Sequence, residues 1–300
     1  LFRSSSALAF TIGTASLTIT ARDTSRVYGS VLTGGAGSTR FTATGLQNGE
    51  TIGSVTLSYA SNGNTSTDAV GVYANAVIAS AATGGTFNAN NYTITYVNGG
   101  ITVTQKTLTV TASAQTKTYG STSPTSGTLN TNYTISGLQG TDAAGSVTLT
   151  YSGTPLGNLA TASAGTYIIT PSALSLSSGS LSNYSVSYVA GTLTVNQASL
   201  TITGLTGVNK KYDGLTDATF TGTPAYSGLK NSESYSVVGT PVANFATASV
   251  GTGKTVTITG YNAPTANYTI IDPTVTANIT AATLKIYALN LYKATNTTIA

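Results

Sequence analysis

The 300-residue sequence contains no Cys, His, Met or Trp, and only 7% of its residues are charged. Without Cys there is no disulfide framework and no thiol chemistry, as is typical of a long exported chain that folds without oxidation. Without His or Cys, the usual partners of a catalytic nucleophile are missing as well. We therefore expect a protein that is not an enzyme, with no catalytic residue, no cofactor and no metal site.

Clustered charge and long apolar runs are also lacking. The formal net charge is +4, but the twelve basic residues are scattered, and the longest basic run is Lys210-Lys211. Nucleic-acid binding needs a clustered cationic face, so we expect no nucleic-acid partner. A transmembrane helix needs about 18 consecutive apolar residues. The apolar runs here are only a few residues long, so we expect no membrane span.

What the sequence does contain is a repeat. An Asn-Tyr pair opens a similar block at Asn91, Asn183 and Asn267, and a Leu follows each Tyr by 16 residues. Self-similarity at a fixed period is typical of a tandem array, and units of this size can each bury a modest core. We predict three β-repeats, followed by the start of another, with these boundaries: 16–106, 107–198, 199–282 and 283–300.

The N-terminal segment has the same register. Phe10 and Ile12 precede Leu17 by seven and five residues, the spacing that separates an apolar pair from the equivalent Leu in the other repeats. Although the segment superficially resembles a signal peptide, this register predicts that residues 1–15 are the tail of a preceding repeat.

Within each repeat, apolar and hydroxyl-bearing residues alternate, as in Val147, Leu149 and Tyr151 with Thr between them. Period-two alternation rich in Thr, Val, Ile and Tyr predicts strands with one face in a core. The 33 Gly and 7 Pro fall between these runs as turns. We predict an all-β fold: a tandem array of three small antiparallel β-domains joined end to end as a rod. Each is an immunoglobulin-like sandwich or, as the alternative, a β-grasp-like sheet.

Two local features add detail to this prediction. The links that contain Gly99 and Gly191 predict tight hairpins, since Gly accepts positive φ. Tyr73 and Tyr167 each lie two residues after a Gly, and this pattern predicts the tyrosine corner of immunoglobulin-like domains. The third repeat has Lys254 in that region instead.

Several short motifs recur together. The repeats share a Leu-Thr-Ile/Val-Thr opening, Tyr-Gly at Tyr28-Gly29 and Tyr119-Gly120, a Gly-Leu element with an acid four residues after its Leu, and a closing Asn-Tyr block. With these motifs, nearly the whole chain resembles the glycine-rich, mostly-β repeats (MBG domains) of large bacterial surface proteins, including filamentous-haemagglutinin-type adhesins. Tyr212-Asp213-Gly214 resembles the related YDG variant, whereas Tyr292-Lys293 stands where the next Tyr-Gly should fall. The resemblance implies an extracellular stalk or adhesive array without catalytic residues.

One carboxylate recurs at the same place in every repeat, as Glu50, Asp142 and Glu233. Hydrolysis by carboxylates needs a pair of them, and calcium takes about six to eight oxygen ligands, normally including several acids. No second acid recurs with these three. We therefore interpret them as acceptors of backbone N–H groups in a turn.

Other polar clusters receive structural interpretations. Asp213 and Asp217 with Lys210 and Lys211 lack the spacing of an EF-hand loop, so we interpret them as a solvated turn. The Asn-Tyr asparagines lie in glycosylation sequons, but we interpret them as strand-entry residues. The tyrosines that follow them share parity with Val and Ile. We predict that these tyrosines lie in the core and do not form a sugar-binding platform.

Two functions remain in view. The first is a non-enzymatic structural repeat region of a bacterial extracellular surface protein, a stalk or filament whose partners are neighbouring repeats of the same chain. Low charge and exposed strand edges also favour self-association into a homopolymer. The alternative is a multivalent adhesin module that binds carbohydrate or a surface protein of a host or neighbouring cell.

Overall fold

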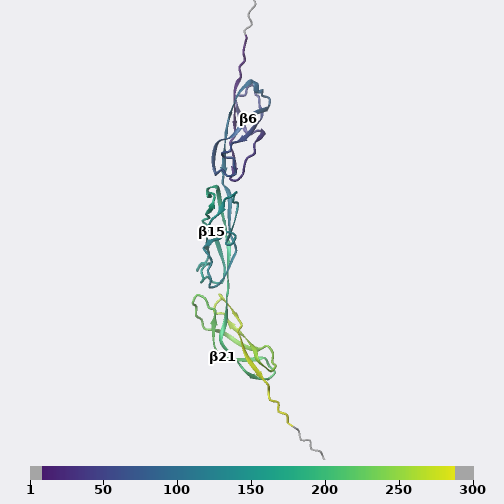
Figure 1. The fold of residues 1–300 in the computed structure, drawn as a ribbon, viewed down its shortest axis with the longest axis vertical. Helices are drawn as coiled ribbons and strands as arrows, with labels where there is room; N and C mark the ends of the chain where they lie inside the picture. The colour runs from purple at the N-terminus through teal and green to yellow at the C-terminus, as the bar shows by residue number, and fades with distance from the viewer. Residues whose placement is uncertain (1–8, 288–300) are drawn as a thin grey trace, which may run out of the picture. The chain divides into compact units, whose positions relative to one another are not determined.

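A computed structural model describes residues 9–287 of the chain, and the fold of these residues is all-β, as predicted (Figure 1). Strands β6, β15 and β21, which are labelled in Figure 1, belong to the first, second and third repeats. Two 3-10 turns, η1 (Ala89–Asn91) and η2 (Leu181–Asn183), each lead into an Asn-Tyr strand. Between residues 9 and 287, no helix has the length and apolar character needed to cross a bilayer.

The strands of the three repeats have the following bounds. The first repeat contains β1 (Ala15–Ala21), β2 (Thr24–Val27), β3 (Gly35–Ser38), β4 (Phe41–Thr44), β5 (Ile52–Tyr59), β6 (Gly71–Gly85), β7 (Tyr92–Val97) and β8 (Gly99–Thr104). The second contains β9 (Lys106–Ala112), β10 (Gln115–Thr118), β11 (Ser126–Gly127), β12 (Tyr133–Ser136), β13 (Ala143–Ala144), β14 (Val147–Tyr151), β15 (Gly165–Ser172), β16 (Leu176–Ser178), β17 (Tyr184–Val189) and β18 (Gly191–Asn196). The third contains β19 (Ala198–Val208), β20 (Lys210–Lys211), β21 (Asp217–Ser227), β22 (Val238–Phe245), β23 (Gly251–Asn262), β24 (Tyr268–Ile271) and β25 (Thr274–Thr280).

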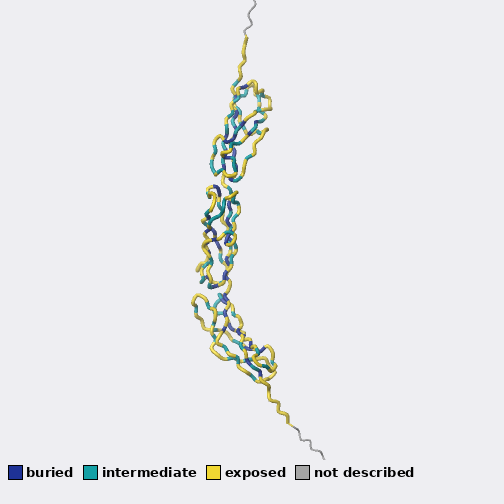
Figure 2. Tube along the Cα trace, in the orientation of Figure 1, coloured by how far each residue is buried: buried dark blue, intermediate teal, exposed yellow. Residues whose placement is uncertain are grey.

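Residues of the period-two pattern lie alternately on the buried and the exposed side of each repeat. In β14 the apolar residues are buried and the threonines between them are exposed, and buried positions alternate with exposed ones along many strands in Figure 2. Leu17, Leu108 and Leu200, which define the repeat, are at most 1% exposed. Burial of a Leu side chain stabilises a fold by about 1.5–3 kcal/mol, so these residues anchor the cores.

Each of the first two repeats contains a three-stranded and a five-stranded sheet. Their strand orders are β4-β1-β7 with β2-β8-β6-β5-β3, and β12-β9-β17 with β10-β18-β15-β14-β11. The second repeat also has the short ribbon β13-β16. In the third repeat, one seven-stranded sheet has the order β20-β25-β23-β22-β21-β19-β24. Its core includes Ile202, Phe245, Val256 and Ile258.

Most strand pairs are antiparallel, as predicted, but the strand that opens each repeat is an exception. This strand pairs in parallel with the Asn-Tyr strand, with Leu17 opposite Ile94 in β1 and β7. The same parallel pairing joins β9 to β17 and β19 to β24. Parallel neighbours need a long crossover connection. Most of a repeat separates these two strands, and it supplies that crossover.

The two predicted hairpins are wrong. Strands β7 and β8 belong to different sheets, and so do β17 and β18, because the chain passes from one sheet to the other at these links. Gly99 and Gly191 do not have positive φ. A Cβ at Gly99 would lie 2.6 Å from the carbonyl oxygen of Ala21, and one at Gly191 would lie 2.4 Å from that of Ala112. Gly is therefore required here for close backbone approach.

The predicted tyrosine corner is confirmed in two repeats. The hydroxyl of Tyr73 donates to the carbonyl oxygen of Ala69, and that of Tyr167 donates to the carbonyl oxygen of Ser163, both at 2.9 Å. In the third repeat, Lys254 Nζ reaches the carbonyl oxygens of Thr247 at 2.6 Å and Ser249 at 2.5 Å. A lysine thus ties down the loop before β23, where a tyrosine does so in the other repeats.

The described chain forms two compact units, and the division between them passes through the second repeat. One unit holds the described residues up to 115 together with 124–151 and 168–192. The other holds residues 116–123, 152–167 and the described residues from 193 onward. Parts of the second repeat therefore group with the first repeat, and other parts group with the third.

Candidate functional site

The recurring acid lies at the end of a six-residue turn, which we call the GL turn (residues 45–50, 137–142 and 228–233). Its first residue is a Gly with φ between +102° and +108°. A Cβ at Gly137 would lie 2.4 Å from the carbonyl oxygen of Thr107 in β9. The Asp142 N–H closes the turn by donating to the carbonyl oxygen of Gln139 at 2.9 Å. The turn therefore lies against the opening strand and fixes the position of the acid.

The acid accepts a hydrogen bond from the tyrosine of the Asn-Tyr pair. Tyr184 donates to Asp142 Oδ2 at 2.5 Å, and the Gln139 N–H donates to the Tyr184 hydroxyl at 3.0 Å. Tyr268 likewise donates to Glu233 at 2.5 Å and accepts from the Lys230 N–H at 2.8 Å. The first repeat has the same contacts among Tyr92, Glu50 and Gln47. The interpretation of these acids as acceptors of backbone N–H groups is wrong, since their partners are phenols.

A second tyrosine reaches Asp142 from the preceding repeat, and we call this contact the first junction. Tyr28, from the Tyr-Gly turn of the first repeat, donates to Asp142 Oδ2 at 3.0 Å. Its ring packs edge-on against Tyr184, with centroids 5.5 Å apart and an interplanar angle of 82°. Beside it, the Val70 N–H donates to Asn183 Oδ1 at 3.0 Å. Tyr28 is only 6% exposed, so the contact is largely shielded from water.

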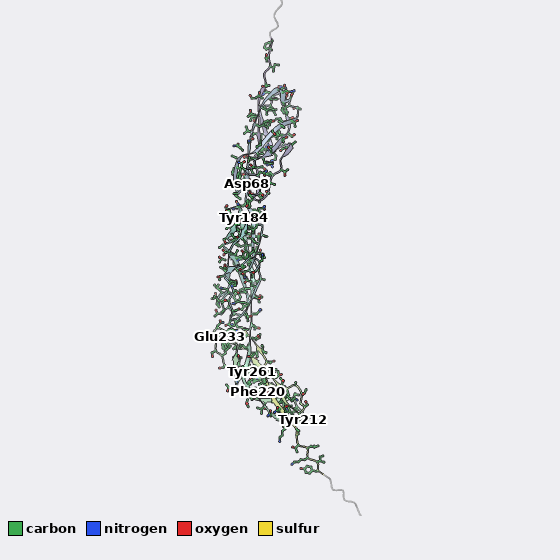
Figure 3. The ribbon with its side chains drawn as sticks, in the orientation of Figure 1. Asp68, Tyr184, Tyr212, Phe220, Glu233 and Tyr261 are labelled. Atoms are coloured by element: carbon green, nitrogen blue, oxygen red, sulfur yellow. The ribbon has the colours of Figure 1, made fainter. Side chains whose placement is uncertain are left out.

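The second junction repeats this arrangement between the second and third repeats. Tyr119 donates to Glu233, and its ring packs edge-on against Tyr268 with centroids 5.4 Å apart. The Ala164 N–H donates to Asn267 Oδ1 at 2.9 Å. Tyr184 and Glu233, one from each junction, are labelled in Figure 3. The Asn-Tyr asparagines do enter a strand as predicted, and two of them, Asn183 and Asn267, also bind the neighbouring repeat.

The Gly of the Tyr-Gly turn lets the turn approach the next repeat closely. Gly29 and Gly120 have φ of +87° and +90°. A Cβ at Gly29 would lie 2.3 Å from Gln139 Oε1, and one at Gly120 would lie 2.6 Å from Lys230 Cγ. The positive φ therefore favours Gly directly after the tyrosine, and any added side chain would also have to displace the flexible side chain of Gln139 or Lys230.

A cation two residues before the tyrosine holds the Tyr-Gly turn in place, and the sequence reasoning missed it. Arg26 donates to the carbonyl oxygens of Ser30 and Thr65 at 2.7 Å and of Gly63 at 2.6 Å. Lys117 donates to those of Ser121 and Leu159. Lys210 occupies the same place in the third repeat. The signal was present in the sequence, since Arg or Lys precedes the tyrosine by two residues every time.

Replacing Arg26 with Lys should destabilise the first repeat by about 1–2 kcal/mol, because an ammonium group cannot reproduce the fork geometry and loses at least one charge-assisted bond. The decrease should appear as faster hydrogen exchange of the loop around Gly63. Lys117→Arg is the matched control, since it makes the reverse exchange at the equivalent position of the second repeat and keeps the positive charge there. Equal exchange in wild type and Arg26→Lys would contradict this role.

Burial and the neighbouring carboxylates keep the junction phenols protonated. Burial first, and then the hydrogen bond to Glu233, raise the pKa of Tyr268 to about 12. Burial and Asp142 similarly raise the pKa of Tyr184 and Tyr28. An ionised phenol has no proton to donate to the acid, and its negative charge would be repelled by the carboxylate. The junctions therefore require neutral tyrosines.

The stability of the second junction should depend on pH. A free Tyr has a pKa near 10, and the folded value at Tyr268 is higher, so the stabilisation is complete below about pH 10. It is lost as the pH rises through about 12. Ultraviolet absorbance titration should show a late-ionising group of tyrosines, with cooperative loosening of the second junction. Tyr268→Phe should remove one late phenol, and an unchanged titration curve would contradict the assignment.

The other polar clusters have structural contacts. Lys210 pairs with Asp213 at 2.9 Å and with Asp217 at 3.2 Å, and both acids are substantially exposed, as expected for a solvated turn. Within residues 9–287, no group of three or more His, Cys, Asp or Glu side chains is arranged to hold a metal ion. The motif at Tyr292-Lys293 lies outside the described residues.

Comparison with known families assigns each repeat to a domain family. Residues 17–102 and 108–194 each match the model of the MBG domain of the YGX type, and together these matches cover more than half of the chain. Residues 196–277 match the model of the YDG domain. No curated protein matches the chain at a significant level. Both docked Tyr-Gly turns lie in MBG-type repeats.

Proposed function

Because this chain belongs to the MBG domain family of the YGX type and carries a YDG domain as well, we propose that it is a structural repeat region of an extracellular surface protein that forms a stalk. MBG and YDG domains are in general non-catalytic repeat domains. Each of the segments 16–106, 107–198 and 199–282 is one structural unit of the proposed stalk. Its function is mechanical: it carries other parts of the protein away from the cell.

The observation that carries this proposal is the recurrence of one junction at both repeat boundaries. Each junction joins a tyrosine of one repeat to a carboxylate and a tyrosine of the next. Only Gln105 separates β8 from β9, and only Gln197 separates β18 from β19. A one-residue link together with a buried side-chain contact restricts bending far more than a flexible linker does. Restricted bending between repeats is the property that a stalk needs.

Electron microscopy of negatively stained chains with different numbers of MBG repeats tests the proposal. A stalk predicts single thin rods whose length grows in proportion to the repeat number. Labelling of intact cells with antibodies should place the repeats at the cell surface. Compact particles of constant length, or repeats confined to the cell interior, would contradict the proposal. Bundled fibres would support a homopolymer, and specific retention on a glycan array would support the multivalent adhesin module.

A further inference from the structure

The first repeat presents the same binding groups as the two junctions, at a face that we call the first-repeat face (Gln47, Glu50, Asn91 and Tyr92). Tyr92 donates to Glu50 and accepts from the Gln47 N–H, as Tyr184 and Tyr268 do in their repeats. These four residues line one hollow together with Ile12. The accepting half of the two junctions therefore exists a third time among the described residues.

The first-repeat face differs from its counterparts in exposure. Asn91 is exposed, whereas Asn183, which binds the first repeat, is only 6% exposed. Ile12 lines the same hollow, and Phe10 lies two residues before it in the sequence; they are 95% and 92% exposed. Their equivalents before Leu108, Ile101 and Val103, are at most 1% exposed in β8. Exposed apolar residues with strand register indicate a strand that lacks its sheet among the described residues.

We propose that the first-repeat face is a docking site for the Tyr-Gly turn of another YGX-type MBG repeat, joined to it through residues 9–14. In the docked state the incoming tyrosine donates to Glu50, packs edge-on against Tyr92, and brings a backbone N–H to Asn91. Phe10 and Ile12 then belong to the last strand of the incoming repeat. This inference deepens the proposed function and rests on it for the tandem arrangement.

The same geometry disfavours the YDG turn as the occupant. Asp213 follows Tyr212 directly, and the positive-φ Gly214, at +82°, comes one residue later. A side chain directly after the tyrosine would have to displace the Gln47 side chain, as a Cβ at Gly29 would have to displace the end of the Gln139 side chain. Tyr212 is 46% exposed, whereas the docked Tyr28 and Tyr119 are 6% and 3% exposed. Among residues 9–287, the turn that a second copy of this chain leaves undocked is the Tyr212 turn, so a second copy is a poor occupant.

The test uses chains extended ahead of Thr14. In the first chain, a copy of residues 106–196 replaces residues 1–13, which presents a Tyr119-Gly120 turn to the first-repeat face. A matched control carries Gly120→Ala in the copy only. A third chain carries a copy of residues 198–280, which presents the YDG turn. Hydrogen exchange is then followed in the peptide that contains Gln47 and Glu50, whose sequence occurs once in every chain.

The first extended chain should show exchange at Gln47 that is about tenfold slower than in the parent, the effect expected from one added hydrogen bond to a charged group. The Gly120→Ala chain and the YDG chain should match the parent. Equal exchange in the first chain and its Gly120→Ala control would overturn the proposal, provided that the copy shows the protection of the native second repeat. Protection that grows with concentration in the parent would assign the face to a second copy instead. Rods of the proposed length without this protection would refute the docking site alone.

Discussion

Replacing Asp142 with Ala will lower the free energy of local opening at the first junction by about 3 kcal/mol, since two shielded phenols lose their acceptor and each such loss costs about 1–3 kcal/mol. Tyr28 and Tyr184 both donate to this one carboxylate, at 3.0 Å and 2.5 Å. The measurement is native-state hydrogen exchange at Gln139 and Val70, whose amides bond to Tyr184 and Asn183. A local probe is needed because a chain with several domains does not unfold in two states.

Two variants serve as controls for Asp142→Ala. Asp142→Asn keeps an acceptor oxygen and removes the charge, so it should cost clearly less. Glu50→Ala removes an acceptor that serves only Tyr92 among the described residues, so it should produce a smaller loss, confined to the first repeat. If Asp142→Ala changed exchange only in the second repeat and left Val70 unaffected, the carboxylate would not connect the two repeats.

Replacing Gly137 with Ala will destabilise the second repeat by about 3 kcal/mol, because a strained φ costs about 1–3 kcal/mol and a backbone clash adds to it. Gly137 has φ of +102°, and its added Cβ would lie 2.4 Å from a carbonyl oxygen of β9. A backbone atom inside a sheet cannot move aside as a flexible side chain can. The displaced GL turn would also carry Gln139 and Asp142 away from the first junction.

Gly140→Ala is the matched control within the same turn. Gly140 has φ of +56°, and a Cβ there would meet nothing within 4 Å. This substitution should cost only the left-handed backbone penalty of about 1–2 kcal/mol. Thermal unfolding and hydrogen exchange of both variants check the difference. Equal losses in Gly137→Ala and Gly140→Ala would show that the contact with Thr107 is unimportant.

The fold was largely predictable from the sequence because the alternation of apolar and polar residues is a local pattern, which shows directly which side chains of a strand face the core. The runs around Leu108 and Val147 each became a strand with the predicted face buried. The run from Tyr184 also became a strand, but only Tyr184 of its predicted face is buried, and Tyr188 is exposed. The tyrosine corner was predictable because its partner lies four residues away. The parallel pairing was not, because alternation specifies which face of a strand is buried and says nothing about the direction of a neighbour distant in sequence.

The junctions were harder to predict, since each joins three segments from two repeats. Tyr28 is 114 residues from its acceptor Asp142, and no local pattern connects them. Considered within one repeat, a single recurring acid without a second acid looks like a turn residue. The available signal was joint recurrence: Tyr-Gly, the GL turn with its acid, and Asn-Tyr appear together in both MBG-type repeats. Such recurrence indicates a shared contact but does not reveal that its members lie in adjacent repeats.

The most direct test of the junction is a double-mutant cycle between Tyr28→Phe and Asp142→Ala, read by hydrogen exchange at Val70 and Gln139. Contacting residues commonly couple by about 0.5–3 kcal/mol, whereas independent sites add within about 0.5 kcal/mol. A bond between the Tyr28 hydroxyl and the Asp142 carboxylate predicts a coupling of at least about 1 kcal/mol, visible in both repeats. Strictly additive effects, or coupling visible in one repeat only, would contradict the conclusion that this pair holds neighbouring repeats together.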